Sequence, residues 1–499
     1  MCGIAAQYGQ PDAEAGRRML DRLVHRGPDD EGCVALGDHA WLGHRRLSIV
    51  DVEGGRQPLG GEPAGDLWLV GNGEVYNHED VGDSLPHASF QTSSDNEVAL
   101  HLVDSHGPDS LEQLNGMFAF VLAGRDGRFL AARDPVGIKP LYWARRGGNV
   151  RFASEMSAFD VDWQPFVEVF PPGHYWTPER GLVEFAPAVP AGDWGAEEVD
   201  PGRTREILIR SVERHMMGDV PVGVFLSGGL DSSLVAAIAA RYLAERGERL
   251  KTFAVGLSDS PDLLAARAVA EFLGTEHHES VYTAAEAVAA VPDVVRAIES
   301  FDPSLVRSAV PNHMLARFTA QHVKVVLTGE GADELFAGYE YLSEFEDEES
   351  LQAELVRSVE GLHNLNLQRC DRVTMAFGLE ARVPFLDREV IGHALRLPPA
   401  SKLASNGRPE KWMLREAFEG WLPHEFLWRG KAQFGDGSGA AGVLTDAIGA
   451  TVSDEDFERE RHAVDPPLRT REELAYYRVF RDHLRGVRPE ATVGRFATA

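Results

Sequence analysis

The pattern of apolar residues changes once along the chain, and this change limits the folds that the chain can adopt. Up to about residue 185, short alternating apolar runs are broken by Gly, Pro and Asn. After a stretch rich in Pro, Ala and Gly at residues 187–201, helical segments alternate with short apolar runs. The first pattern predicts sheet packed on sheet. The second is typical of a parallel sheet covered by helices.

These patterns predict two domains, and the length of 499 residues is enough for both. We expect the first domain at residues 1–187, a linker at 188–200 and the second domain at 201–499. In the second domain we predict strands at residues 222–226, 251–257 and 323–327, and a helix at 232–246. The part after about residue 350 is expected to be mostly helical.

The charge of the chain argues against some classes of partner. The chain has 49 basic and 78 acidic residues, a formal net charge of −29, which disfavours binding to nucleic acid. No run of 18 apolar residues and no secretory signal is present, so we expect a cytoplasmic protein without a membrane span. Only six of the basic residues are lysines. Adaptation to a high-salt cytoplasm and a GC-rich genome both explain this, and the sequence does not separate them.

One of the three cysteines has a special position. Cys33 and Cys370 are interpreted as small buried hydrophobes, and no pair of cysteines has a zinc-ligand spacing. Cys2 becomes the first residue if Met1 is removed. It then carries a thiol together with an α-amine of unperturbed pKa near ~8, which can serve as the thiol's own general base.

Four later segments place Cys2 in a known pattern. They are residues 25–29 (HRGPD), 46–51 (RLSIVD), 72–77 (NGEVYN) and 94–95 (SD). With Cys2-Gly3-Ile4 and in this order, they resemble the class II glutamine amidotransferase domain. The resemblance covers about the first 185 residues. It implies an N-terminal-nucleophile fold in which two facing sheets lie between helices.

The resemblance also implies a role for each matching residue. Cys2 attacks the side-chain amide of glutamine, and the Asn72 side chain and Gly73 N–H form the oxyanion hole. Arg46 holds the glutamine carboxylate. Asp95 binds its α-ammonium group with help from Glu74. The products are glutamate and ammonia.

The second domain has a loop with the properties of a phosphate site. Residues 227–232 (SGGLDS) lie between a predicted strand and a predicted helix. Glycines allow a close approach of the backbone, and a helix N-terminus attracts anions. Asp231 offers a hard oxygen ligand for Mg²⁺. The segment resembles the loop of ATP-pyrophosphatase enzymes, which release pyrophosphate and form acyl-adenylates.

Further segments resemble the asparagine synthetase family, in family order over almost the whole chain. Residues 253–257 (FAVGL), 328–339 (TGEGADELFAGY) and 381–387 (ARVPFLD) carry the resemblance. It implies ATP as co-substrate and Mg²⁺ shared by Asp231 and Asp333. Glu330 is expected near the reacting carboxylate, and Lys431 neutralises pyrophosphate. The other implied contacts to ATP or pyrophosphate are Leu226, Ser227, Gly228, Gly229, Ser232, Val255, Thr328 and Gly329.

The acceptor segment departs from the family pattern. Residues 301–308 resemble the segment near the aspartate pocket, where two threonines normally precede the arginine. Here Ser304 keeps one hydroxyl, Leu305 replaces the other, and Arg307 remains to bind a carboxylate. A lost hydroxyl changes recognition strongly, because buried polar partners dominate discrimination.

Three functions are therefore considered. The first is an ATP-dependent carbon–nitrogen ligase that makes asparagine from aspartate through a β-aspartyl-adenylate. The second is a related amidotransferase for another small carboxylic acid. The third is a non-catalytic relative, which the intact Cys2, Asp231 and Asp333 disfavour. A homodimer is what the family suggests.

Overall fold

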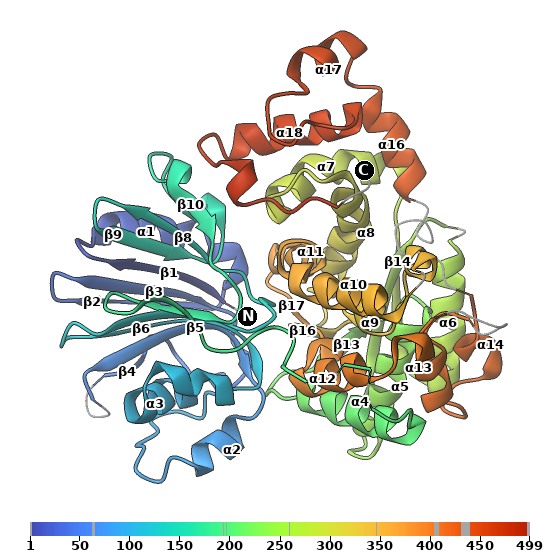
Figure 1. Ribbon diagram of the computed structural model, residues 1–499, viewed down its shortest axis with the longest axis horizontal. Helices are drawn as coiled ribbons and strands as arrows, with labels where there is room; N and C mark the ends of the chain where they lie inside the picture. The colour runs from blue at the N-terminus through green and yellow to red at the C-terminus, as the bar shows by residue number, and fades with distance from the viewer. Residues whose placement is uncertain are drawn as a thin grey trace.

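The computed structural model describes every residue except 1, 62–64, 193, 196, 259, 346, 404–408, 431–439 and 497–499. Lys431 therefore lies outside the described residues. We refer to residues 2–187 as the amino-terminal half and to residues 201–496 as the carboxy-terminal half. Figure 1 shows the two halves side by side, with the start of the chain where they meet. No helix in the described part of the chain is both long and apolar enough to cross a membrane.

The amino-terminal half contains the predicted pair of sheets, and all their strand pairs are antiparallel. The first sheet has the order β10 (Val167–Val169), β8 (Tyr142–Arg146), β9 (Asn149–Ala153), β1 (Gly3–Tyr8), β3 (Ala40–Arg46) and β2 (Asp30–Leu36). The second has the order β12 (Gly181–Glu184), β11 (His174–Thr177), β7 (Phe129–Arg133), β6 (Gly116–Gly124), β5 (Leu67–Val75) and β4 (Leu59–Gly60).

Apolar side chains fill the space between these sheets and cover their outer faces. Ile4 and Leu42 of the first sheet share a core cluster with Val121 and Phe129 of the second. The helix α1 (Ala13–Asp21) covers one outer face, and α2 (His78–Asp83) and α3 (Glu97–His106) cover the other (Figure 1). This four-layer arrangement confirms the fold that the resemblance implied. It places β1, which directly follows Cys2, and β5, which carries Asn72, Gly73 and Glu74, in facing sheets.

One cysteine prediction is wrong. Cys33 is exposed, whereas Cys370 is buried as expected. Cys33 lies on β2, which is the edge strand of the first sheet and alternates between partly and fully exposed residues along most of its length. Successive side chains of a strand point to opposite faces, so at such an edge a short apolar side chain on the outer face is exposed to solvent.

The carboxy-terminal half contains the predicted parallel sheet. Its order is β15 (Glu276–Val281), β14 (Lys251–Gly256), β13 (Val222–Phe225), β16 (Val325–Leu327) and β17 (Glu380–Arg382). All four strand pairs are parallel. Strand β16 is fully buried, as is typical of a strand covered on both faces. The third strand begins at Val325 rather than at residue 323, and the first helix after β13 begins at Leu230 rather than at residue 232.

Helices surround this sheet and make up most of the described residues after residue 350. Before that point they are α4 (Pro201–His215), α5 (Leu230–Ala244), α6 (Pro261–Leu273), α7 (Ala284–Ile298), α8 (Pro303–Thr319) and α9 (Ala332–Leu335). The later ones are α10 (Glu348–Gly361), α11 (Asn366–Met375), α12 (Arg388–Arg396), α13 (Trp412–Ala417), α14 (His424–Leu427), α16 (Ala440–Gly449), α17 (Asp454–Glu460) and α18 (Arg471–His483). Because β13 and β16 are parallel neighbours, the loops that follow them lie at the same edge of the sheet.

Candidate functional site

Cys2 lies at the start of β1, opposite an asparagine of β5. The Cys2 backbone N–H donates to Asn72 Oδ1 at 3.0 Å, and Cys2 is 8% exposed. Asn72 is fully buried, and its Nδ2 has no hydrogen-bond partner among the described residues. A buried donor without a partner is costly. Asn72 thus holds the main chain of Cys2 with one atom and keeps a donor free beside it.

Gly73 must be glycine at this position. Its φ is +143°, and a Cβ there would lie 1.8 Å from the carbonyl oxygen of Met117 on the neighbouring strand. Asn96 Nδ2 donates to the Gly73 carbonyl oxygen at 3.0 Å, which fixes the peptide from the other side. The backbone next to Asn72 is therefore rigid before any substrate binds.

Arg46 and Asp95 are each held in place by backbone groups. Arg46 donates to three carbonyl oxygens of one loop, those of Val50 at 3.1 Å, Asp51 at 2.6 Å and Val52 at 3.0 Å. Asp95 Oδ2 accepts from the Val75 N–H at 2.6 Å. Burial raises the pKa of Asp95, although that backbone contact opposes the shift.

Glu74 pairs with an arginine of the other half of the molecule. Its carboxylate lies 3.5 Å from the guanidinium of Arg382, which also pairs with Glu380 at 2.5 Å. Burial and the charges of Glu380 and Asp95 raise the pKa of Glu74 well above its ordinary value. Both Arg382 and Glu380 lie on β17, so Glu74 contacts the carboxy-terminal half.

The predicted phosphate loop connects β13 to α5. Ser232 Oγ lies 3.0 Å from Ser227 Oγ, accepts from the Ser227 N–H at 3.2 Å and donates to the Gly229 carbonyl oxygen at 3.2 Å. Gly228 has a φ of +73°. These contacts close the loop into a compact turn at the start of α5. Leu226 and Val255, the predicted nucleotide neighbours, are both buried.

The second predicted loop touches the first one. Thr328 donates its N–H to the Arg382 carbonyl oxygen at 2.9 Å, directly after β16. A Cβ on Gly329 would lie 2.8 Å from the Cβ of Asp231 in the first loop. The two loops are distant in sequence but are in contact at the sheet edge.

Asp231 and Asp333 converge on one lysine. Lys411 Nζ lies 2.6 Å from Asp231 Oδ2 and 2.6 Å from Asp333 Oδ1, so the two carboxylate oxygens are within twice that distance of each other. Burial alone would lower the pKa of Lys411, but the two carboxylates more than offset this, and the pKa is raised. The backbone of Gly338 lies close beside them, since a Cβ there would lie 2.0 Å from Asp333 Oδ1.

Glu330 lies in the same loop and has an arginine partner. Its carboxylate pairs with Arg369 of α11. Burial raises the pKa of Glu330, although the charge of Arg369 opposes the shift. Burial also raises the pKa of the nearby Glu334 to about 7, helped by the charge of Asp333.

The acceptor segment forms the first turn of α8. Ser304 and Arg307 are three residues apart, so they share one face of the helix. Leu305 is fully buried in the core. Arg307 already has a carboxylate partner, since its Nε and one terminal nitrogen donate to Glu472 of α18 at 3.0 and 2.6 Å. Tyr476 also donates to Glu472, at 2.8 Å.

Three of these residues are not predicted by any sequence motif. Lys411, Arg369 and Glu472 lie in no segment that resembled a known loop. The one available signal was the scarcity of lysine, because each of six lysines in an acidic chain is a candidate for a specific role. Arginine and glutamate are too common here to give such a signal.

Comparisons with known proteins match both halves of the chain to known families. The family model for asparagine synthase matches residues 203–345 and 343–491, and the model for the glutamine amidotransferase domain matches residues 1–179. The chain is 43% identical over 467 residues to a glutamine-hydrolysing asparagine synthetase of Asparagus officinalis, covering 88% of this chain and 78% of that protein. It is 40% identical to such enzymes of Arabidopsis thaliana and Sandersonia aurantiaca, covering 96% of this chain in each case and 86% and 95% of those proteins.

Proposed function

The chain belongs to the family of glutamine-hydrolysing asparagine synthetases, and from this premise we propose how its residues make asparagine from aspartate, glutamine and ATP. The single observation that carries the proposal is the presence, in one chain, of two separate groups of polar residues that suit the two half-reactions. One contains Cys2 and Asn72, and the other contains Asp231, Asp333 and Lys411. The amino-terminal half is assigned to glutamine hydrolysis and the carboxy-terminal half to the ligase reaction.

At the first site, Cys2 acts after removal of Met1. Its α-amine accepts the thiol proton, and the sulfur attacks the side-chain amide carbon of glutamine. Asn72 Nδ2 and the Gly73 N–H donate to the oxygen as negative charge develops there. The protonated amine gives its proton to the departing ammonia, and water then hydrolyses the thioester to glutamate. Arg46 and Asp95 hold the two ends of the substrate.

At the second site, the loops of residues 227–232 and 328–331 bind ATP. The β-carboxylate of aspartate attacks the α-phosphorus of ATP and pyrophosphate departs. Ammonia then displaces AMP from the acyl-adenylate and leaves asparagine. Glu330 lies beside the reacting carboxylate, and the backbone N–H groups at the start of α5 bind the phosphates. Lys431 keeps its proposed role with pyrophosphate.

The residues of the second site suit Mg²⁺. This ion is usually held by one or two carboxylates together with substrate phosphates, and Asp231 and Asp333 both direct an oxygen at one cationic group. When bound with ATP, Mg²⁺ would neutralise part of the negative charge of the phosphates. Asp231 and Asp333 would hold it, and Lys411 would then turn its ammonium group to the phosphates.

Three further properties complete the proposal. The domain boundaries are residues 1–187, 188–200 and 201–499. The protein is cytoplasmic, and it forms a homodimer as the family suggests. A second candidate acceptor, another small carboxylic acid, is favoured by Leu305 and by the Glu472 partner of Arg307.

A pyrophosphate-release assay tests the function and the acceptor together. The enzyme receives glutamine, Mg²⁺–ATP and a panel of small acids, and the amide product is identified by mass. We expect aspartate to give the highest kcat/KM and asparagine to be the product. If another acid reacts faster, that acid replaces aspartate as the proposed acceptor. If no acid gives turnover, the proposed function is refuted.

A further inference from the structure

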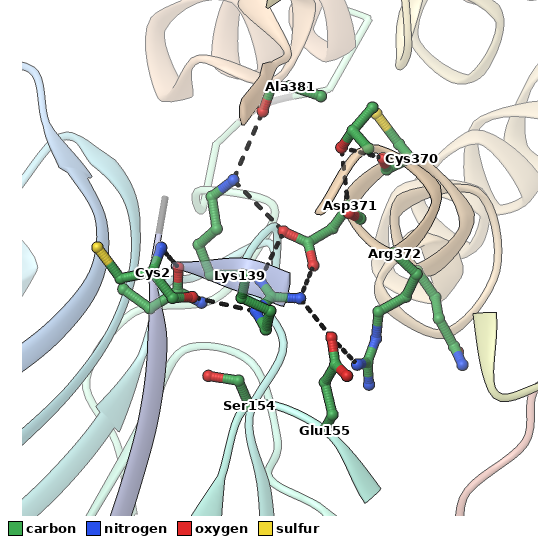
Figure 2. A network of polar contacts seen from close by, with 12 residues as sticks. Cys2, Lys139, Ser154, Glu155, Cys370, Asp371, Arg372 and Ala381 are labelled. Carbon is green, nitrogen blue, oxygen red and sulfur yellow. Dashed lines mark hydrogen bonds and ion pairs between the residues drawn. The ribbon is translucent and has the colours of Figure 1, made fainter. Parts of the chain in front are cut away.

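One turn of α11 carries charged side chains that contact both halves of the molecule. Arg369 pairs with Glu330 of the second site. Asp371, which is labelled in Figure 2, accepts from Arg26 of the amino-terminal half. Residues two apart on a helix are about 200° apart around its axis, so Arg369 and Asp371 point to opposite sides of α11. The helix therefore separates the two sites and contacts both of them.

Arg26 links Asp371 to the nucleophile. Its side chain is fully buried, and its Nε donates to the Cys2 carbonyl oxygen at 3.0 Å. One terminal nitrogen lies 2.9 Å from Asp371 Oδ2 and 2.8 Å from Glu155 Oε1, and the other lies 3.3 Å from Asp371 Oδ1. A guanidinium with this many charge-assisted contacts has a fixed plane. The main chain of Cys2 is thus held from α11 through a single side chain.

The surrounding charges are balanced and buried. Lys139 Nζ lies 3.7 Å from Asp371, and Arg372 lies 2.8 Å from Glu155 and 3.0 Å from Glu299. The three cations Arg26, Lys139 and Arg372 therefore face the three anions Asp371, Glu155 and Glu299 (Figure 2 labels four of these residues). In such a cluster, loss of one charge leaves its partner buried without compensation. Asp371 is the member that contacts both Arg26 and Lys139.

We propose that Asp371 is a positioning residue for glutamine hydrolysis, although it lies in the carboxy-terminal half. It fixes Arg26, and Arg26 fixes the main chain of Cys2 relative to Asn72 and Gly73. Arg369, the partner of Glu330, is two residues away on the same helix, so a movement of Glu330 when ATP and aspartate bind would be passed to Asp371. Glutamine hydrolysis thereby responds to the state of the ligase site. This inference rests on the roles of Cys2 and Glu330 in the proposed function.

The test compares Asp371→Asn and Asp371→Glu with the wild type. The Asn variant keeps the shape but loses the charge, so kcat for glutamine hydrolysis should fall about 10- to 100-fold, while KM for glutamine should change less than about threefold because Arg46 and Asp95 are untouched. Synthesis from ammonium salt should stay within about twofold. The Glu variant restores the charge one methylene further out, and its kcat should lie between the two, several-fold below the wild type. The matched control is Asp104→Asn, which removes a half-exposed partner of Arg128 and should behave as wild type.

A second readout addresses the coupling. In the wild type, ATP with aspartate should raise the rate of glutamine hydrolysis several-fold, and in Asp371→Asn this increase should be absent. Equal losses of glutamine-dependent and ammonium-dependent synthesis would overturn the inference, because they indicate a purely structural role. A wild-type rate of glutamine hydrolysis in Asp371→Asn would also overturn it. If Asp371→Asn does not fold, a wild-type rate in Asp371→Glu would do the same. Failure of the wild type to hydrolyse glutamine at all would instead refute the proposed function.

Discussion

Replacing Lys411 with Met separates the electrostatic role of this lysine from its packing. Met keeps most of the length and flexibility of the side chain and removes the charge. In the wild type the ammonium group lies 2.6 Å from a carboxylate oxygen of both Asp231 and Asp333. In the variant these two partly buried carboxylates lose the ammonium group that lies between them.

The size of the effect follows from that geometry. Two unit charges roughly 5 Å apart repel by about 3 kcal/mol at an effective dielectric constant of ~20. Removal of one member of a buried ion pair costs a similar amount, about 3–5 kcal/mol. For a unit of about 300 residues, a loss of ~3 kcal/mol lowers Tm by roughly 5 °C. Without the ammonium group of Lys411, the two carboxylates should also bind a divalent cation more strongly than in the wild type.

Thermal unfolding with EDTA, and then with MgCl₂ in the absence of ATP, measures both consequences. We expect Lys411→Met to be less stable than the wild type in EDTA. Mg²⁺ at about a hundredfold excess over its Kd should restore about 2.7 kcal/mol to the variant. The wild type should respond far less, because its own ammonium group competes with the ion. Equal effects of Mg²⁺ on the Tm of both proteins, or an unchanged Tm of the variant in EDTA, would refute the reasoning. The control variant is Lys251→Met, which removes a lysine at the partly buried start of β14.

Three other substitutions test single features. Asn72→Ala removes one oxyanion donor, so kcat with glutamine should fall about 10²- to 10³-fold while synthesis from ammonium salt is unchanged; a fall below threefold contradicts this role. Lys402 is fully buried with no hydrogen-bond partner for Nζ in the described part of the chain, and burial lowers its pKa to about 7. Above pH 7 the unfolded chain binds this proton more strongly than the folded one. The free energy of unfolding of the wild type should therefore rise by about 1 kcal/mol per pH unit, relative to Lys402→Met, between pH 7 and 9. A difference between the two proteins that does not change with pH would disprove this. Glu472→Gln removes the anion that competes for Arg307, so KM for aspartate should fall several-fold; a higher KM would mean that Glu472 orients Arg307 for the acceptor.

Local patterns predicted the elements and the loops that connect them. The change from alternating apolar runs to strand–helix alternation predicted both kinds of sheet. The loops containing Asp231 and Asp333 were expected to act together, and the parallel pairing of β13 and β16 brings them to one edge. Such features depend on residues near each other in sequence, or on the geometry of a parallel sheet, and both can be read from the chain.

Contacts between distant segments could not be predicted in this way. Lys411 reaches Asp231 across 180 residues, Arg307 reaches Glu472 across 165, and Arg26 reaches Asp371 across 345. No periodicity or motif records these pairings, because they depend on how whole elements pack. The exposed Cys33 was misjudged for the same reason, since only the strand order shows that β2 is an edge.

The division of work between the two halves is tested most directly by the activities of Cys2→Ala. Asparagine formation is measured once with glutamine and once with an ammonium salt as the nitrogen source, with ATP, Mg²⁺ and aspartate present in both. We predict no detectable synthesis from glutamine and a wild-type rate from ammonium. Loss of both activities, or synthesis from glutamine by the variant that lacks the thiol, would contradict this division of work between the two halves.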